Sequence, residues 1–219
     1  MTTPSFSAEQ ARMLASLDPA LRALALRGNV RNYRKNTVII EEGDVGDALF
    51  VLLQGSVKVY AMDANGRELT YGTIKAGDYF GEMSLDGGLR SASVMTLESC
   101  SCSVVSRDSV REHLAEEPQF ALDLVAQVIR RARAATETAR NMALLDVYGR
   151  VIAELERVEG PGSAAAPVVL KPITHLSIAT RVGASREMVS RLLKDLEKGG
   201  YVELGVKKIT LFKKLPARW

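Results

Sequence analysis

The apolar residues between positions 173 and 198 recur at spacings of three and four and form two separate stripes. Such spacing predicts two consecutive amphipathic helices. Thr174 and Ser185 each precede a stripe and are good N-caps, while Gly183 supplies the permissive backbone that a sharp turn needs. The sequence therefore predicts a helix-turn-helix. The apolar positions are Leu176, Ile178, Ala179 and Val182 in the first helix, and Met188, Val189, Leu192, Leu193 and Leu196 in the second.

The outer face of the second helix carries side chains that can read DNA bases. An Arg guanidinium matches the two major-groove acceptors of guanine, a Glu carboxylate accepts from the cytosine amino group, and the N-terminal end of a recognition helix reaches base edges. The alternative is an ordinary solvated face in which Glu187 and Arg191 form an i,i+4 ion pair. The residues predicted to contact DNA here are Ser185, Arg186, Glu187, Ser190 and Arg191.

Two short β-runs follow this helix and favour the DNA-binding interpretation. Residues 201–204 and 208–212 are typical of a hairpin joined at 205–207, which is the wing of a winged helix. Lys208 lies on this hairpin, where it could touch phosphates, as could the lysines at 207, 213 and 214. Residues 146–219 hold 13 Lys and Arg against 8 Asp and Glu, a net charge of +5. The whole chain has a net charge of +3, so the excess of positive charge lies in this third.

The first half of the chain has a different pattern, with short β-rich runs between regularly spaced glycines. The runs at 37–40, 48–53 and 56–60 are separated by turns, and glycines recur every 10 to 12 residues at 43, 55, 66, 77 and 87/88. This spacing predicts a β-sandwich or small barrel. A helix from about Ser7 to Arg27 is expected to precede the barrel and to pack on it.

A long helix is predicted between the two halves. From Pro118 there is no proline or glycine until Gly149, and small or apolar residues repeat at alternating spacings of 4 and 3, as in a heptad seam. A symmetric dimer is favoured over a single helix packed on its own domain, because a helix-turn-helix commonly reads paired half-sites. A flexible loop is expected at 160–167 and a hinge at 141–146. The seam residues are Ala121, Val125, Val128, Ala132, Ala135, Ala139 and Met142, flanked by Arg130, Arg131, Arg133 and Arg140.

Composition limits the remaining possibilities. With 219 residues and 47% hydrophobic content, the chain suits two domains. It has no apolar run of about 18 residues and no signal-peptide pattern, so a cytoplasmic location without membrane contact is expected. Cys100 and Cys102 are too few for a cluster and are expected to be buried side chains, while His113 and His175 lie in different predicted elements. We expect neither a metal site nor enzymatic activity, since no catalytic constellation is present.

Residues 80–92, FGEMSLDGGLRSA, are the remaining candidate for chemistry. Glu82 could accept from a ribose hydroxyl, Arg90 could hold a phosphate by two parallel hydrogen bonds, and Ser91 with nearby backbone N–H groups could complete an anion site. The alternative is a structural glycine-rich loop with one Glu–Arg ion pair. The candidate ligand-binding residues in this stretch are Gly81, Glu82, Met83, Arg90 and Ser91.

Taken together, the chain resembles the cyclic-AMP receptor protein and fumarate-nitrate regulator family of bacterial transcription factors over nearly its full length. Three stretches carry the resemblance: residues 80–92, 141–151 and 173–202. The family implies an α+β fold with a cyclic-nucleotide-binding-type β-roll at 1–118, a dimerisation helix and hinge at 119–145, and a winged helix-turn-helix at 146–219.

The resemblance also implies roles for individual residues. Glu82 would meet the ribose of a cyclic nucleotide and Arg90 with Ser91 its phosphate, while Arg186, Glu187 and Arg191 would read bases. An adenine-facing Thr-Ser pair of the family falls on Ala135-Thr136, so that only Thr136 keeps a hydroxyl.

The expected function is a ligand-responsive transcription regulator that binds a two-fold symmetric DNA site as a homodimer and also contacts RNA polymerase. Cyclic AMP is the leading effector, with cyclic GMP, a cyclic dinucleotide or no ligand as alternatives. Signalling through protein contacts remains a second possibility. An iron–sulfur oxygen sensor is disfavoured, because such a cluster normally needs four thiolates and the chain has two cysteines.

Overall fold

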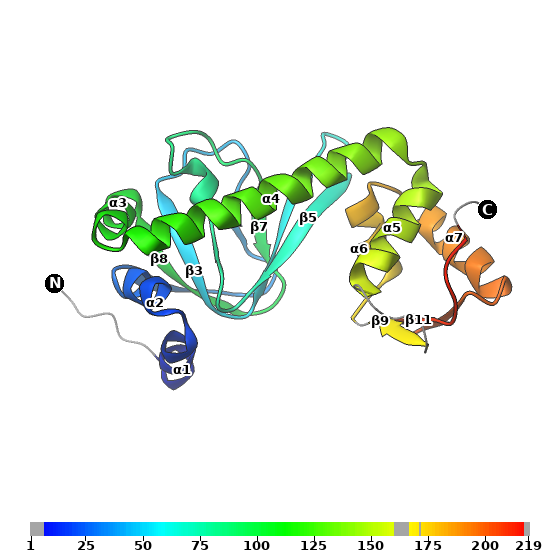
Figure 1. Cartoon of the computed structure of the whole chain (residues 1–219), viewed down its shortest axis with the longest axis horizontal. Helices are drawn as coiled ribbons and strands as arrows, with labels where there is room; N and C mark the ends of the chain where they lie inside the picture. The colour runs from blue at the N-terminus through cyan, green and yellow to red at the C-terminus, as the bar shows by residue number, and fades with distance from the viewer. Residues whose placement is uncertain (1–6, 160–166, 171, 217–219) are drawn as a thin grey trace. The chain divides into compact units, whose positions relative to one another are not determined.

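The computed structural model describes residues 7–159, 167–170 and 172–216, which form two compact units. Of these residues, the β-roll unit comprises those up to 61 together with 70–133, and the winged-helix unit comprises 62–69 and those from 134 onward. The elements, drawn in Figure 1, are α1 (Ala8–Ser16), α2 (Pro19–Leu26), β1 (Asn29–Tyr33), β2 (Val38–Ile40), β3 (Ala48–Gln54), β4 (Ser56–Met62), β5 (Glu68–Lys75), β6 (Tyr79–Phe80), the 3₁₀ helix η1 (Glu82–Ser84), β7 (Ser93–Thr96), β8 (Cys100–Ser106), α3 (Arg107–Glu116), α4 (Pro118–Leu144), α5 (Val147–Glu159), β9 (Val168–Leu170), α6 (His175–Val182), α7 (Arg186–Lys198), β10 (Val202–Gly205) and β11 (Lys208–Leu211).

The β-roll unit is built from two four-stranded sheets with strand orders β1-β8-β3-β6 and β2-β7-β4-β5. The central strand β3 is buried on both faces, which explains its uninterrupted apolar run. Leu49 and Val51 pack among the helices, whereas Phe50 and Leu52 point into the core shared with the second sheet. This alternation places β3 between two hydrophobic cores, and its start, at Ala48, borders the candidate ligand loop.

The N-terminal region forms two helices, so the prediction of one continuous helix from Ser7 to Arg27 is wrong. α1 ends at Ser16, and Asp18 caps α2 by accepting a hydrogen bond from the Ala20 N–H at 2.9 Å. Pro19 occupies the first position of α2, where its missing N–H leaves no helical bond unmade. The Asp-Pro pair therefore starts a new helix and interrupts the first.

Helix α4 runs unbroken from Pro118 to Leu144, as the absence of internal proline and glycine predicts. Its first turn is anchored in the β-roll unit by Phe120, which is buried and packs against the rings of Tyr79 and His113. Further along, Gln127 donates to the carboxylate of Asp78 at 3.2 Å. These contacts fix the rotation of α4 about its own axis relative to the roll.

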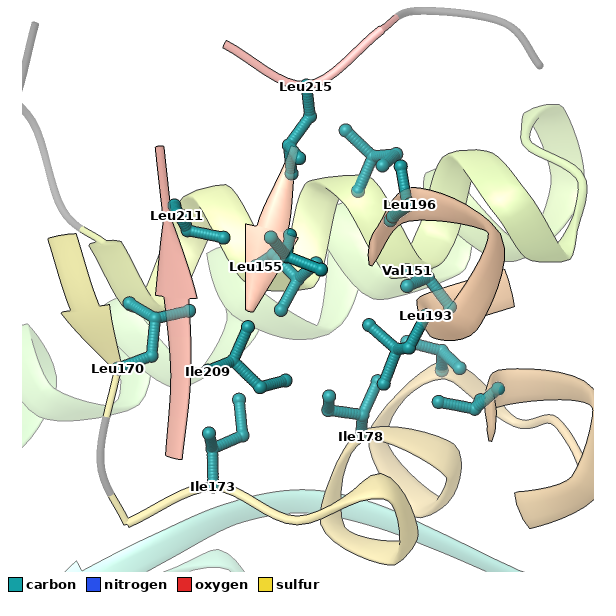
Figure 2. Packing of buried hydrophobic residues seen from close by; sticks show 14 of the residues in the cluster. Val151, Leu155, Leu170, Ile173, Ile178, Leu193, Leu196, Ile209, Leu211 and Leu215 are labelled. Atoms are coloured by element: carbon teal, nitrogen blue, oxygen red, sulfur yellow. The ribbon is translucent and has the colours of Figure 1, made fainter. Parts of the chain in front are cut away.

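The winged-helix unit packs α5, α6 and α7 against the sheet β10-β11-β9. Figure 2 shows the side chains that meet in its core. Thr174 and Ser185 cap α6 and α7 as predicted, and Gly183 ends α6 in the left-handed conformation, with φ 62°. The core side chains labelled in Figure 2 are Val151, Leu155, Leu170, Ile173, Ile178, Leu193, Leu196, Ile209, Leu211 and Leu215.

Two details of the predicted apolar stripes are wrong. Leu176 and Met188 are 56% and 41% exposed. Met188 lies about 100° around α7 from Val189, which points into the core, because successive helical residues turn by that angle. Leu176 lies about 200° around α6 from the buried Ile178, two positions further along. Strand β9 was not predicted, and it pairs with β11 through Val169 and Thr210. The predicted loop at 160–167 lies outside the described residues except for Pro167.

Candidate functional site

The loop that follows β6 begins with a backbone conformation that favours glycine. Gly81 adopts φ +88°, and a Cβ at this position would stand 2.8 Å from the Arg90 Nη1 atom and 3.1 Å from the Ala48 carbonyl oxygen. Any other residue would be strained here and would also push the Arg90 side chain away. Gly81 therefore lets the chain turn tightly into η1, which carries Glu82 and Ser84.

Arg90 is a buried cation held by neutral acceptors. It is 8% exposed, and its guanidinium donates to the Gly81 carbonyl at 2.8 Å, the Ser84 hydroxyl at 2.7 Å and the Ala48 carbonyl at 2.9 Å. Burial lowers the pKa of Arg90, while the nearby carboxylates of Asp47, Glu82 and Asp44 oppose this shift. No carboxylate within the described part of the chain lies close enough to form an ion pair with it. A buried guanidinium without a direct ion pair suits an anionic ligand.

Glu82 complements Arg90 with a buried negative charge. Its side chain is 1% exposed and forms an ion pair with Arg131 of α4. Neither carboxylate oxygen makes a hydrogen bond of good geometry within the described residues, so the group keeps capacity to accept one. Arg131 also donates to the Tyr79 carbonyl at 2.7 Å, which ties α4 to the end of β6. A buried carboxylate with an open acceptor fits a ligand hydroxyl.

A second arginine, Arg107, forms hydrogen bonds to the backbone of the same loop and of the neighbouring Gly46. Arg107, the first residue of α3, donates from one Nη atom to the carbonyl of Gly46 at 2.5 Å and to that of Ser84 at 3.0 Å. Gly46 is itself packed tightly, since a Cβ there would lie 2.2 Å from the Arg90 Nε atom. These contacts hold the Arg90 guanidinium in a fixed cradle.

The remaining residues of the predicted ligand site are less constrained. Met83 is 54% exposed, and the Ser91 hydroxyl, also exposed, lies 3.6 Å from its sulfur. Thr136 is exposed on α4 and belongs to the other compact unit. The structure thus brings together Gly81, Glu82 and Arg90 in one cradle, with Ser91 and Met83 at its surface.

The start of α7 presents the predicted DNA-contacting residues to solvent. Ser185 caps the helix by accepting from the Met188 N–H at 3.2 Å, and Arg186, Glu187 and Arg191 are exposed. Hydrogen bonds from its own backbone N–H and from Ser185 lower the pKa of Glu187, so its carboxylate is ionised near neutral pH. In the described part of the chain, Glu187 and Arg191 form no ion pair, so both remain available as separate groups.

The lysines predicted on and after the wing differ in their exposure and in their contacts. Lys208 is half-buried at the start of β11, and Lys207 is exposed in the turn. Lys213 instead donates to the Gly199 carbonyl at 3.1 Å and lies over the ring of Tyr201. Its ammonium group therefore stabilises the C-terminal end of α7, which makes it a poorer candidate for phosphate contact than Lys207 or Lys208.

Comparison with known proteins assigns a domain family to each half of the chain. Residues 30–117 match the cyclic nucleotide-binding domain family and residues 149–214 match the Crp-like helix-turn-helix domain. The chain is 32% identical over 186 residues to the cAMP-activated global transcriptional regulator CRP of Pasteurella multocida, a match covering 83% of this chain and 89% of that protein. This chain belongs to the CRP/FNR family of transcription regulators.

Other members of the CRP/FNR family show the same relationship. The cAMP-activated global transcriptional regulator Vfr of Pseudomonas aeruginosa is 34% identical over 189 residues, which cover 83% of this chain and 88% of Vfr. The structure of CLP, the c-di-GMP responsive global regulator of Xanthomonas campestris, is similar in fold, with a TM-score of 0.75 at 24% identity over 88% of this chain and 98% of that one. The predicted family, α+β architecture and DNA-binding helix-turn-helix are confirmed.

Sequence reasoning missed Arg131 in this CRP/FNR regulator. It was expected only to flank the dimer seam together with the arginines at 130, 133 and 140, and the structure corrects this by turning it toward Glu82. The alternative of a Glu82–Arg90 ion pair is also wrong, because each residue has its own partners. A run of similar arginines on one helix gives no sequence signal that singles out one of them.

Two further observations bear on other ligands and environments. No group of three or more His, Cys, Asp or Glu side chains in the described ranges is placed to hold a metal ion. Within the same ranges, no helix is both long enough and apolar enough to cross a bilayer.

Proposed function

We propose that this protein is a ligand-responsive, sequence-specific DNA-binding regulator that works as a homodimer on a two-fold symmetric site, with a cyclic nucleotide as effector. The observation that carries the proposal is the pairing, within one CRP/FNR chain, of an exposed basic recognition helix with a cradle of buried, incompletely compensated charges. The recognition helix would bind DNA, and an effector bound in the cradle would control that binding.

The DNA-reading residues follow from the exposure of α7. Arg186 and Arg191 would each face guanine and Glu187 would face cytosine, so half-sites of the TGTGA or TTGA type, about one helical turn apart, are preferred. Ser185 and Ser190 add hydroxyls to this surface. Lys208 would contact phosphate from the wing and would contribute little to sequence preference.

The effector-binding residues follow from the cradle. Arg90 would hold the cyclic phosphate and Glu82 would accept from the ribose hydroxyl, with Gly81, Met83 and Ser91 lining the same loop. Cyclic AMP is the leading candidate, because the named relatives CRP and Vfr respond to it. CLP responds to c-di-GMP, so the cyclic dinucleotide is the first alternative.

The dimer interface would lie along α4. Leu122, Val125 and Ile129 are 64%, 54% and 45% exposed at helical spacings of three and four. An apolar stripe of this kind in water calls for a partner, and a second copy supplies an identical one. Small residues further along the seam, including Ala132, would allow the two helices to approach closely.

The DNA-binding part of the proposal is tested by two substitutions with different expected signatures. Arg186→Ala should cost about 1–3 kcal/mol on the preferred site and relax one base-pair position in each half-site. Lys208→Ala is the matched control: it should weaken all sequences about equally and reduce the dependence on salt. The measurement is fluorescence anisotropy on a duplex selected from a random pool and on random DNA. Equal loss on both duplexes for Arg186→Ala would contradict the assignment.

A further inference from the structure

A hydrogen bond connects the two helices of the helix-turn-helix. The His175 Nδ1 atom, on the first residue of α6, lies 2.8 Å from the Ser190 hydroxyl oxygen, on the second turn of α7. Both side chains are half-buried, so this contact lies at the boundary between the packed core and the solvent. Ser190 is also on the helix proposed to enter the major groove.

The state of His175 is set by its surroundings. Burial lowers the pKa of His175, and the nearby cations Arg186 and Lys194 lower it further, while Glu197 opposes them. The imidazole is therefore neutral near pH 7, so one ring nitrogen can accept a hydrogen bond and the other can donate one. A neutral imidazole can fix the direction of the single hydroxyl proton of Ser190.

We propose that His175 is a positioning residue for base selection: it accepts the Ser190 hydroxyl proton and leaves the Ser190 oxygen lone pairs facing the DNA. A serine hydroxyl left free to rotate can donate or accept, so it discriminates poorly between bases. A serine whose proton is held by His175 can only accept. In the major groove, the donors it would meet are the amino groups of adenine and cytosine.

This inference rests on the proposed DNA-reading role of α7. It adds a residue of α6, His175, to those that determine base preference. His175 would act through Ser190, without touching the base itself. Its loss should therefore alter preference at one base-pair position in each half-site and leave general DNA affinity almost unchanged.

The test compares variants of the full chain on duplexes carrying every single base-pair substitution in one half-site. His175→Leu should reduce discrimination at the Ser190 position about three- to tenfold, the value of one hydrogen bond, with little change elsewhere. His175→Asn should keep most of the discrimination, because its amide oxygen can accept the same proton. Thr180→Ala is the matched control, since the Thr180 hydroxyl has one hydrogen-bond partner among the described residues, the Ser177 carbonyl of the same helix at 3.3 Å.

A double-mutant cycle separates this effect from general damage to the fold. Ser190→Ala should lose discrimination at the same position, and His175→Leu added to Ser190→Ala should cause no further loss there. A uniform loss at all positions and on random DNA for His175→Leu, with His175→Asn no better, would mean that His175 is merely structural. An unchanged preference when the selected adenine or cytosine is replaced by an analogue that lacks its major-groove amino group would contradict the proposed polarity.

The outcomes also distinguish failure of the inference from failure of the proposed function. If Ser190→Ala changes one position and His175→Leu does not, the inference is overturned and DNA reading by α7 stands. If neither Ser190→Ala nor Arg186→Ala changes any position, both are overturned.

Discussion

Removing either partner of the Glu82–Arg131 ion pair should lower the free energy of unfolding by different amounts. The Glu82 side chain is 1% exposed and the Arg131 side chain is 27% exposed. Removing Arg131 leaves a fully buried carboxylate without its cation, whereas removing the Glu82 charge leaves an arginine that water already reaches. The two single substitutions should therefore differ, although they break the same contact.

The magnitudes follow from these two exposures. Breaking a buried pair by deleting one partner costs about 3–5 kcal/mol, and partial access of water reduces that figure. We expect about 2–4 kcal/mol for Arg131→Met, which keeps the aliphatic packing, and about 1–2 kcal/mol for Glu82→Gln.

The assay is urea unfolding of the full chain, combined with hydrogen exchange of the segment that contains β6 and η1. Arg130→Met is the control, since Arg130 is an exposed neighbour on the same helix. Arg130→Met should change stability by less than about 0.5 kcal/mol. Equal losses for Arg131→Met and Glu82→Gln would refute this account of the site.

Three further predictions concern the core, the cradle and the dimer. His113 is fully buried, and burial lowers its pKa from the ordinary 6.5, so the unfolded state binds more protons than the folded state. The free energy of unfolding should therefore fall below about pH 6.5, by up to about 1.4 kcal/mol per pH unit. His113→Leu should flatten this slope in pH-dependent unfolding, and an unchanged slope would contradict the prediction. Gly46→Ala should displace the Arg90 guanidinium and cost about 1–3 kcal/mol by overpacking, measured as a lower unfolding midpoint. Gly66→Ala is the comparison: a Cβ there meets no atom within 4 Å, so this variant tests only the strain of a positive φ. Ala132→Glu should place like charges in the α4 seam and yield monomers in sedimentation, and a wild-type monomer at micromolar concentration would argue against the proposed interface.

Local features of this fold were predictable from the sequence because neighbouring residues determine them. Thr174, Gly183 and Ser185 set the ends of α6 and α7 through caps and a left-handed glycine, and the structure confirms each one. The break at Asp18-Pro19 was equally local, and its cap followed by a first-position proline is a signal that could have been used. Strand β9, at 168–170, is too short to show a pattern of its own and depends on pairing with β11.

The candidate ligand site was predictable only in part. Glu82 and Arg90 belong to one short motif, for which the resemblance implies roles that stay predictions. Their actual partners depend on contacts between distant segments, as with Arg131, 49 positions after Glu82, and Ala48, 42 positions before Arg90. The rotation of α4 about its axis, which Phe120 and Gln127 fix by packing, decides which arginine reaches the loop.

The central claim is that occupancy of the Arg90 cradle controls specific DNA binding, and a titration of DNA with and without saturating effector tests it most directly. Wild-type protein and Arg90→Ala are each titrated onto the selected duplex with cyclic AMP, cyclic GMP, c-di-GMP or no addition. One of these nucleotides should tighten wild-type binding about 5- to 150-fold, as coupling of about 1–3 kcal/mol requires, and DNA should tighten nucleotide binding by the same factor. Arg90→Ala should lose the response but keep its salt-sensitive affinity for random DNA. Identical wild-type curves under all four conditions, or an undiminished response in Arg90→Ala, would contradict the claim.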